Sequence, residues 1–264
     1  MSKTLGLALG AGGSRGVAHI GFLKALEEVG IVPQFVSGCS MGAVVGACYC
    51  AGVSPDKMKE VALELSLKDI ATLNFRPFRQ NGLMKFTKAR AIMADIMGEK
   101  SFEELKIPFV CVATDLIEGK TVTLDKGNVI DAALASSSIP GAITPASFGE
   151  YQMLVDGCIL ERVPTKELKK MGAEVIVAVD VLGNLPENKE PSGHLINTLL
   201  RVIDVMDTQN TMNKRRARMR YVDLYLEPKL GAMDQYSVKN LAFAYEKGYE
   251  LGVSERENIR KLIK

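Results

Sequence analysis

Residues 36–44 read V-S-G-C-S-M-G-A-V, and within them Gly38-Cys39-Ser40-Met41-Gly42 matches the pattern G-x-S-x-G. The apolar residues before this pattern predict a strand over 34–37, and the small residues after it predict a helix over 41–51. A serine on such a sharp strand-to-helix turn is exposed, and the positive end of the helix dipole favours an anion beside it. Ser40 is therefore a candidate nucleophile, and the alternative is a Gly/Ser turn without chemistry.

Strands and helices alternate along the rest of the chain. Residues 4–9 (T-L-G-L-A-L) predict a buried parallel strand, and apolar side chains then recur at helical spacing over 18–29. Further strands are predicted over 108–114, 121–124, 175–181 and 221–226, and further helices from Pro55, over 195–218 and over 237–262. This order favours one α/β domain over 1–264 around a mostly parallel sheet, with a motif core at about 4–181 and a C-terminal helix, strand and helix at about 195–262.

Two stretches lack a regular pattern. Residues 67–86 mix apolar and basic side chains around Arg76-Pro77 and Asn81-Gly82, which indicate loops. This stretch is interpreted either as a mobile cover over a site or as a packed surface loop. Residues 183–194 predict a polar connection that contains proline and glycine.

Composition excludes several classes of protein. The net charge of +2 over 264 residues argues against an obligate nucleic-acid binder. The five cysteines form no C-x-x-C pair, which is typical of reduced thiols rather than of a disulfide framework or a zinc site. The start lacks the apolar core of a secretory signal, and no stretch approaches 18 uncharged apolar residues. We expect a cytoplasmic protein without a metal or an organic cofactor.

A glycine-rich stretch, Gly10-Ala11-Gly12-Gly13-Ser14-Arg15-Gly16, follows the first predicted strand. Consecutive glycines free backbone N–H groups to point into one pocket, and a serine nucleophile needs such donors for its tetrahedral intermediate. Arg15 either adds a cation or locks the loop. Dinucleotide binding is disfavoured, because Ala11 occupies a glycine position of that motif and the next strand ends in Val36-Ser37 without an acidic residue.

An aspartate follows a second apolar run, Tyr151-Gln152-Met153-Leu154-Val155, and precedes Gly157. This position at a predicted strand end lets Asp156 face a site. An ordinary Asp-Gly turn gives the same pattern. Asp156 alone is therefore not distinctive.

Together these motifs resemble, in order and spacing, the patatin-like phospholipases. The resemblance rests on the glycine-rich loop with Arg15, the G-x-S-x-G at 38–42, the segment Ala135-Ser136-Ser137-Ser138-Ile139-Pro140 and the Asp156-Gly157 pair. The stretches 16–28 and 102–108 also look like those of the bacterial members. The likeness runs from about residue 4 to the strand at 175–181 and is weaker beyond it.

The resemblance implies a three-layer α/β fold of the patatin type and a serine acyl hydrolase that acts on lipid or lysophospholipid esters. Ser40 would be the nucleophile and Asp156 its base, without a catalytic histidine, and Gly12, Gly13 and Ser14 would supply the oxyanion N–H groups. The supporting residues around this site would be Arg15, Gly16, Gly38, Gly42 and Gly157. A carboxylate of ordinary pKa, ~3.9, is a weak base for a serine hydroxyl, so hydrogen bonding and the oxyanion hole must assist it.

Three positions depart from the family pattern. Ala11 replaces a glycine, and Cys158 stands where glycine or alanine is usual. Glu161-Arg162-Val163-Pro164 occupies the place of an Asn-x-Pro, so a hydrogen bond that supports this loop differs. None of the three removes a catalytic group.

Two alternatives remain open at this point. Ser40, Asp156 and His194 fall in the chain order of an α/β-hydrolase triad, although Ser40 follows only the second predicted strand and His194 lies in a polar connection. His19, beside the glycine-rich loop, is interpreted as structural. The other alternative is a regulatory or scaffolding protein that keeps the fold without catalysis.

A basic run ends the helix predicted over 195–218. It comprises Lys214, Arg215, Arg216, Arg218 and Arg220. Such a run attracts anionic lipid head groups, which would give a peripheral contact with a membrane surface. A solvated helix end, favoured by the helix dipole, explains it equally well.

Overall fold

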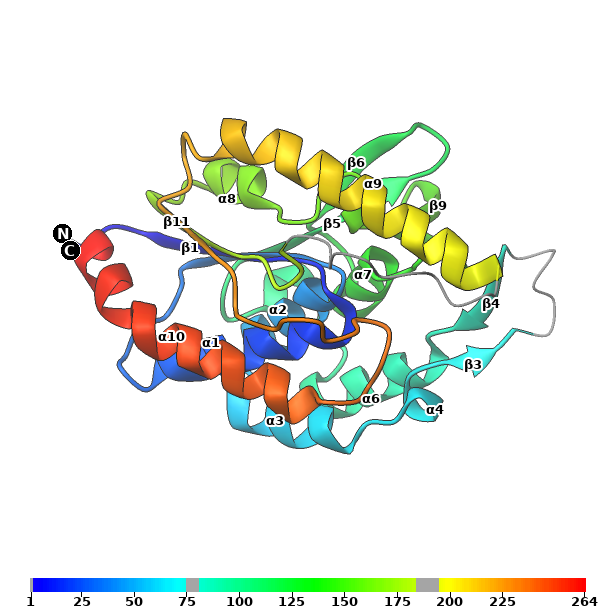
Figure 1. Ribbon diagram of the computed structural model, residues 1–264, viewed down its shortest axis with the longest axis horizontal. Helices are drawn as coiled ribbons and strands as arrows, with labels where there is room; N and C mark the ends of the chain where they lie inside the picture. The colour runs from blue at the N-terminus through cyan, green and yellow to red at the C-terminus, as the bar shows by residue number, and fades with distance from the viewer. Residues whose placement is uncertain (1, 75–80, 184–194) are drawn as a thin grey trace.

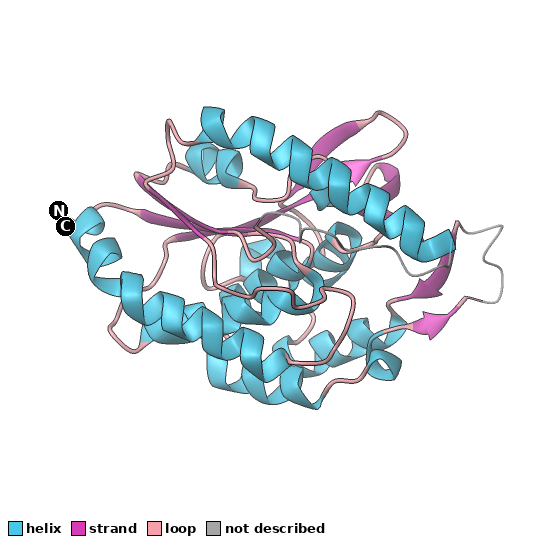
Figure 2. Cartoon of the chain, viewed as in Figure 1, coloured by secondary structure: helices cyan, strands magenta, loops and turns pink. Residues whose placement is uncertain are grey.

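A mostly parallel sheet with helices on both faces forms the centre of the protein (Figure 1, Figure 2). The computed structural model describes residues 2–74, 81–183 and 195–264. The main sheet has eight strands in the order β11-β10-β1-β2-β5-β9-β8, with β6 beside β5. Their bounds are β1 Leu5–Leu9, β2 Phe35–Cys39, β5 Phe109–Asp115, β6 Lys120–Leu124, β8 Ala146–Phe148, β9 Tyr151–Asp156, β10 Val175–Val179 and β11 Leu224–Leu226. The predicted α/β architecture is confirmed.

Strand β5 sets the positions of the two predicted catalytic residues. It pairs in parallel with β2, where Val112 lies opposite Cys39, and antiparallel with β9, where Ala113 lies opposite Asp156. Ser40 directly follows Cys39 in sequence. The ends of β2 and β9 therefore meet at the neighbouring positions Val112 and Ala113 on one edge of β5, which brings the serine and the aspartate together although they are far apart along the chain.

Helices cover both faces of this sheet and form the outer two layers. The lower layer in Figure 1 contains α1 (Val17–Glu27), α2 (Met41–Ala51), α3 (Pro55–Glu64), α6 (Thr87–Met97), α7 (Val129–Ser136) and α10 (Leu241–Ile263), and the upper layer contains α8 (Thr165–Met171) and α9 (Leu195–Arg218). Ser54 caps α3, because its Oγ accepts the Lys57 N–H at 3.2 Å. Among the described residues no helix is both long and apolar enough to span a membrane.

The stretch 67–86 is more regular than its sequence suggests. It contains a short helix, α4 (Leu67–Ile70), and two antiparallel strands, β3 (Thr72–Leu73) and β4 (Gly82–Lys85). Strand β4 also pairs with β7 (Gly141–Ile143), which follows α7. The expectation of an irregular stretch is therefore wrong at both of its ends, because long-range pairing with β7 supplies hydrogen bonds that local sequence does not reveal. Residues 75–80 and the predicted connection over 184–194, including His194, lie outside the described residues.

Candidate active site

Ser40 sits on the turn between β2 and α2 in a strained conformation. Its backbone has φ 54° and ψ −126°, a region that side-chain-bearing residues rarely occupy. Two contacts hold it there: the Ser40 N–H donates to Ser136 Oγ at 2.9 Å, and the Ser40 carbonyl accepts the N–H groups of Ala43 and Val44 at 2.8 and 3.1 Å. Gly42 allows the turn to close, because a Cβ on it would lie 2.2 Å from the Leu9 carbonyl oxygen.

The Ser40 hydroxyl donates directly to Asp156, with 2.6 Å between Oγ and Oδ2. The other carboxylate oxygen accepts the N–H of Cys158 at 2.9 Å, and the Asp156 N–H donates to the Ser138 carbonyl at 2.9 Å. Asp156 is only 2% exposed, so its surroundings strip water from the carboxylate. Burial raises its pKa, against the opposing effect of the hydrogen bonds from Ser40 and Cys158. The carboxylate is therefore a stronger base than a solvated aspartate.

Two thiols lie beside this pair. Cys39 Sγ is 3.9 Å from Asp156 Oδ1, and Cys158 packs in the same small cluster with Ala11 and Val112. Burial raises the pKa of both thiols well above the usual range, and the negative charge of Asp156 adds to this. Both cysteines are therefore protonated and do not compete with Ser40 as nucleophiles.

The glycine-rich stretch forms a loop and a short 3-10 turn, η1 (Gly13–Gly16). The Ser14 N–H donates to the Gln235 carbonyl at 2.9 Å, and Ser14 Oγ donates to the Asp234 carbonyl at 3.0 Å. In the described part of the chain, the N–H groups of Gly12 and Gly13 have no backbone acceptor. Gly13 has φ +49°, and a Cβ on it would lie 2.3 Å from the Gln235 carbonyl oxygen. The loop thus presents two free donors, while the third predicted donor is engaged.

The remaining predicted glycines of the site all lie against neighbouring atoms. An added Cβ would lie within 3 Å of Val181 at Gly12, Met41 at Gly16, Ala43 at Gly38 and the Val112 carbonyl at Gly157. Side chains at these positions would displace the glycine-rich loop, Asp156, or the strand-to-helix turn at Ser40, which we call the elbow. The glycines therefore set the close spacing of the three segments.

Arg15 is 7% exposed, and its Nε has no hydrogen-bond acceptor among the described residues. Burial lowers its pKa, and the charge of Asp180 opposes this. His19 is fully buried, with Nε2 2.8 Å from the Gly10 carbonyl, so this nitrogen carries the proton. Burial lowers the pKa of His19 to about 4. This neutral histidine supports the loop and touches neither Ser40 nor Asp156 through a hydrogen bond.

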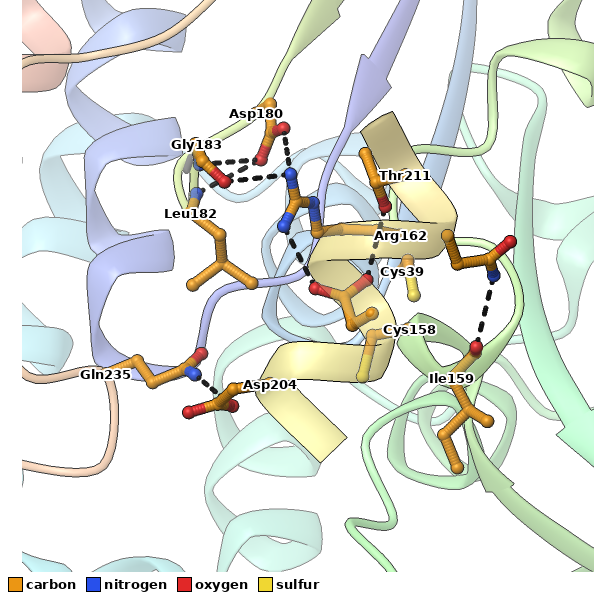
Figure 3. A network of polar contacts seen from close by, with 12 residues as sticks. Cys39, Cys158, Ile159, Arg162, Asp180, Leu182, Gly183, Asp204, Thr211 and Gln235 are labelled. Atoms are coloured by element: carbon orange, nitrogen blue, oxygen red, sulfur yellow. Dashed lines mark hydrogen bonds and ion pairs between the residues drawn. The ribbon is translucent and has the colours of Figure 1, made fainter. Parts of the chain in front are cut away.

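A buried charged network lies between the site and α9, and the sequence analysis did not find it (Figure 3). Arg162 donates through Nη2 to Asp180 at 2.7 Å and through Nη1 to Asp207 at 2.9 Å. Tyr225 OH also donates to Asp180, at 2.7 Å. The Arg162 carbonyl accepts the Ala11 N–H at 3.0 Å, so the same residue holds the glycine-rich loop. Asp180 directly follows the apolar strand β10, and an apolar run before an aspartate is the signal that marked Asp156.

Within residues 2–74, 81–183 and 195–264, no group of three or more His, Cys, Asp or Glu residues is placed to hold a metal ion. The contacts around Ser40 consist of a hydroxyl, a carboxylate and backbone N–H groups. These are the parts of an acyl-transfer site.

Known proteins are similar to this chain in sequence and in architecture. The family model described as patatin-like phospholipase matches residues 7–169. An uncharacterized NTE family protein of Mycobacterium bovis is 37% identical over 183 residues, which cover 69% of this chain and 50% of that protein. The lysophospholipase nte1 of Emericella nidulans is 28% identical over 297 residues, covering 98% of this chain and 18% of that protein. The chain thus spans half the length of the first relative and less of the second.

A solved structure supports the fold independently. VipD from Legionella pneumophila superimposes with a TM-score of 0.56 at 12% sequence identity, over 97% of this chain and 67% of that chain. At this identity the likeness concerns the fold alone. The match of the family model covers more than half of the chain and includes the elbow, the glycine-rich loop and Asp156. The chain therefore belongs to the patatin-like phospholipase family.

Proposed function

We propose that the protein is a serine acyl hydrolase that cleaves carboxylic esters of lipids through Ser40 and Asp156. One observation carries the proposal: the 2.6 Å hydrogen bond from a strained serine at the N-terminus of α2 to a buried carboxylate. A strained nucleophile aimed at a base of raised pKa is characteristic of covalent acyl transfer. The membership of the family and the lysophospholipase name of one relative support a lipid substrate.

In the first half of the cycle, Ser40 Oγ attacks the ester carbonyl while Asp156 Oδ2 accepts the hydroxyl proton. The carbonyl oxygen becomes an oxyanion, for which the N–H groups of Gly12 and Gly13 are the available donors. Collapse of this intermediate breaks the bond to the alcohol oxygen, which leaves with the proton from Asp156. The acyl group is then esterified to Ser40.

In the second half, a water molecule attacks the acyl-enzyme and gives its proton to Asp156. Collapse of the second intermediate releases the fatty acid, and the proton returns to Ser40. Because Asp156 must be ionised to begin either half, activity should fall as the pH drops through its raised pKa. No histidine takes part in this scheme.

The decisive experiment combines active-site labelling with a matched pair of aspartate variants. A fluorophosphonate probe should label Ser40, identified by peptide mapping, and Ser40→Ala should abolish the label. Asp156→Asn keeps the side-chain shape but cannot accept a proton, so hydrolysis of a soluble ester should fall by about 10²–10⁴. Asp115→Asn is the control, since Asp115 is also buried and also accepts a backbone N–H, from Ile117 at 2.9 Å.

Four outcomes would contradict the proposal. Label on a residue other than Ser40 would assign a different nucleophile. Full activity of Asp156→Asn, with its fold intact by circular dichroism, would assign a different base. An inactive His194→Ala variant would favour the triad over the pair. An unlabelled, inactive protein of native fold would instead support a non-catalytic member of the family.

A further inference from the structure

Helix α9 turns a row of large apolar side chains toward solvent. Leu195, Leu199, Val202 and Met206 follow one another at steps of four, three and four, which places them on one face of the helix. Their exposed fractions are 77%, 47%, 49% and 60%. We call these four residues the outer stripe. A surface helix ordinarily turns such a face toward the core.

The opposite side of α9 is correspondingly polar. The fully buried residues of α9, among the side chains that the structure describes, are Asp207, Thr208 and Thr211. Asp207 pairs with Arg162, and Thr211 Oγ1 donates to Asp207 at 3.3 Å (Figure 3). The apolar residues on this side, Ile196, Leu200 and Ile203, are only half-buried. The helix is therefore attached to the protein mainly by polar groups, and the outer stripe is not needed to pack the core.

We propose that the outer stripe docks the protein onto an anionic lipid bilayer, with α9 lying in the plane of the interface. An amphipathic helix binds in this way by burying its apolar face at the boundary between head groups and acyl chains. Contiguous exposed apolar residues on a folded protein mark an interaction site, and singly scattered ones do not.

The charges around the stripe favour an anionic membrane as its partner. Segment 195–220 contains six basic and two acidic residues. The two acidic residues are turned away from the stripe: Asp207 is buried, and Asp204 accepts hydrogen bonds from Gln235 Nε2 at 2.8 Å and Tyr236 OH at 2.6 Å. Arg216 and Arg220 are exposed at the other end of the helix. An apolar row followed by exposed arginines complements acyl chains beside anionic head groups.

The position of α9 connects this surface with the candidate active site. Asn210 Nδ2 donates to the carbonyls of Ile159 and Leu160 at 3.3 and 3.0 Å, at the end of the 3-10 turn η3 (Gly157–Ile159) that follows Asp156. The helix that would bind the bilayer through its outer stripe is therefore the same helix that contacts the loop after Asp156. In this respect the inference rests on the proposed lipid substrate.

The test is co-sedimentation of the full chain with phosphatidylcholine vesicles, prepared with and without phosphatidylserine. Wild-type protein should bind both, and the anionic vesicles more tightly. Val202→Glu combined with Met206→Glu should weaken binding to both by about tenfold or more, because two apolar side chains that would enter the bilayer are replaced by charges. Arg216→Glu with Arg220→Glu should weaken binding to anionic vesicles only, by about fivefold or more per residue.

The matched control is Phe243→Glu combined with Val253→Glu. These exposed apolar residues lie on α10, in the opposite layer of the fold, and their replacement should leave binding unchanged (Figure 1). Unchanged binding of the Val202/Met206 variant, or no binding by the wild type, would overturn the inference. So would a wild-type dimer that this variant converts into a monomer, since a second copy would then cover the stripe.

Labelling of Ser40 without vesicles reports on the proposed function separately. The Val202/Met206 variant should be labelled by a soluble fluorophosphonate at the wild-type rate, because neither residue belongs to the catalytic site. Loss of vesicle binding with full labelling supports docking through the stripe. Normal vesicle binding without any labelling would contradict the proposed hydrolase and leave the docking surface standing.

Discussion

Helices α9 and α10 have nearly equal lengths, 24 and 23 residues, and lie on opposite faces of the sheet (Figure 1). They are nevertheless held to the protein by different kinds of contact. Helix α10 meets α1 at glycines: a Cβ on Gly248 would lie 1.8 Å from the Ala18 carbonyl oxygen, and one on Gly252 would lie 2.6 Å from Ala25 Cβ. Helix α9 is fixed by the ion pair between Asp207 and Arg162 and by side-chain hydrogen bonds. Close apolar packing is insensitive to pH, whereas a buried charge network is not.

The largest effect is expected where α10 touches α1. Gly248→Val should undock α10 and lower the free energy of unfolding by more than about 4 kcal/mol, because backbone on α1 would have to move. Ser254→Val, on an exposed position of the same helix, controls for the helix propensity of valine. Urea denaturation followed by circular dichroism measures both. Equal stability of the two variants would show that the two helices do not approach this closely.

The next effect concerns the centre of the network below α9. Arg162→Met should lower the free energy of unfolding by about 3–5 kcal/mol, because Asp180 and Asp207 would be left buried without a cation. Adding Asp207→Asn to Arg162→Met should recover part of this loss, since one of the two uncompensated charges is removed. A double variant less stable than Arg162→Met would rule out the charge as the cause.

The pH dependence of α9 follows from the same network. Asp180 and Asp207 raise the pKa of Arg162 even though burial lowers it, so the guanidinium remains charged. Burial raises the pKa of Asp207 to about 6, with Arg162 opposing. Asp207 is therefore the carboxyl group of this network that we expect to bind a proton as the pH falls through about 6.

The folded state therefore binds this proton more tightly than the unfolded state, in which aspartate has an ordinary pKa of ~3.9. The stability that protonation of Asp207 contributes is fully present below the unfolded pKa of ~3.9, and it is lost as the pH rises through about 6. Relative to Asp207→Asn, the wild type should lose about 2 kcal/mol between pH 4 and pH 7. Parallel pH profiles of the two proteins in urea denaturation would contradict this assignment.

The smallest effect is expected at the surface end of α9. Arg215 Nη1 lies 2.7 Å from Glu227 Oε1, with side chains 42% and 33% exposed. Water and salt screen such a pair, so Glu227→Gln should cost less than about 1 kcal/mol, and the cost should shrink at high ionic strength. A larger loss of unfolding free energy that does not change with salt would show that this pair behaves like the buried network of Arg162.

The sequence predicted best where local pattern and tertiary role agree. The helix over 41–51 and the strand and aspartate at 151–156 were recognisable because apolar runs end there in small or acidic residues. Helix α9 was predicted with its observed bounds, 195–218, but its apolar spacing gave no indication of which face is exposed. Helix α10 begins at Leu241 rather than at 237, because residues before it form turns around Gln235.

Long-range contacts explain the rest. The pairing of β4 with β7 and the contacts of Arg162 join segments whose own sequences carry no periodic signal. Helix α7 was not predicted, although Asn128 caps it by accepting the Asp131 N–H at 3.1 Å. The engagement of the Ser14 N–H by Gln235 depends on a segment far along the chain. Such pairings are decided by the folded topology and not by neighbouring residues.

The hydrogen bonds from Ser14 to the carbonyls of Asp234 and Gln235 also determine when, during synthesis, the glycine-rich loop can be completed. A ribosome makes the elbow, the glycine-rich loop and Asp156 well before it reaches residue 235, adding roughly 5–20 residues per second. Until that residue has emerged, Ser14 lacks both of the carbonyls that hold it, at 2.9 and 3.0 Å. The nascent chain thus carries its serine and its aspartate for several seconds before the loop beside them is secured. The loop beside Ser40 is therefore completed only late in synthesis.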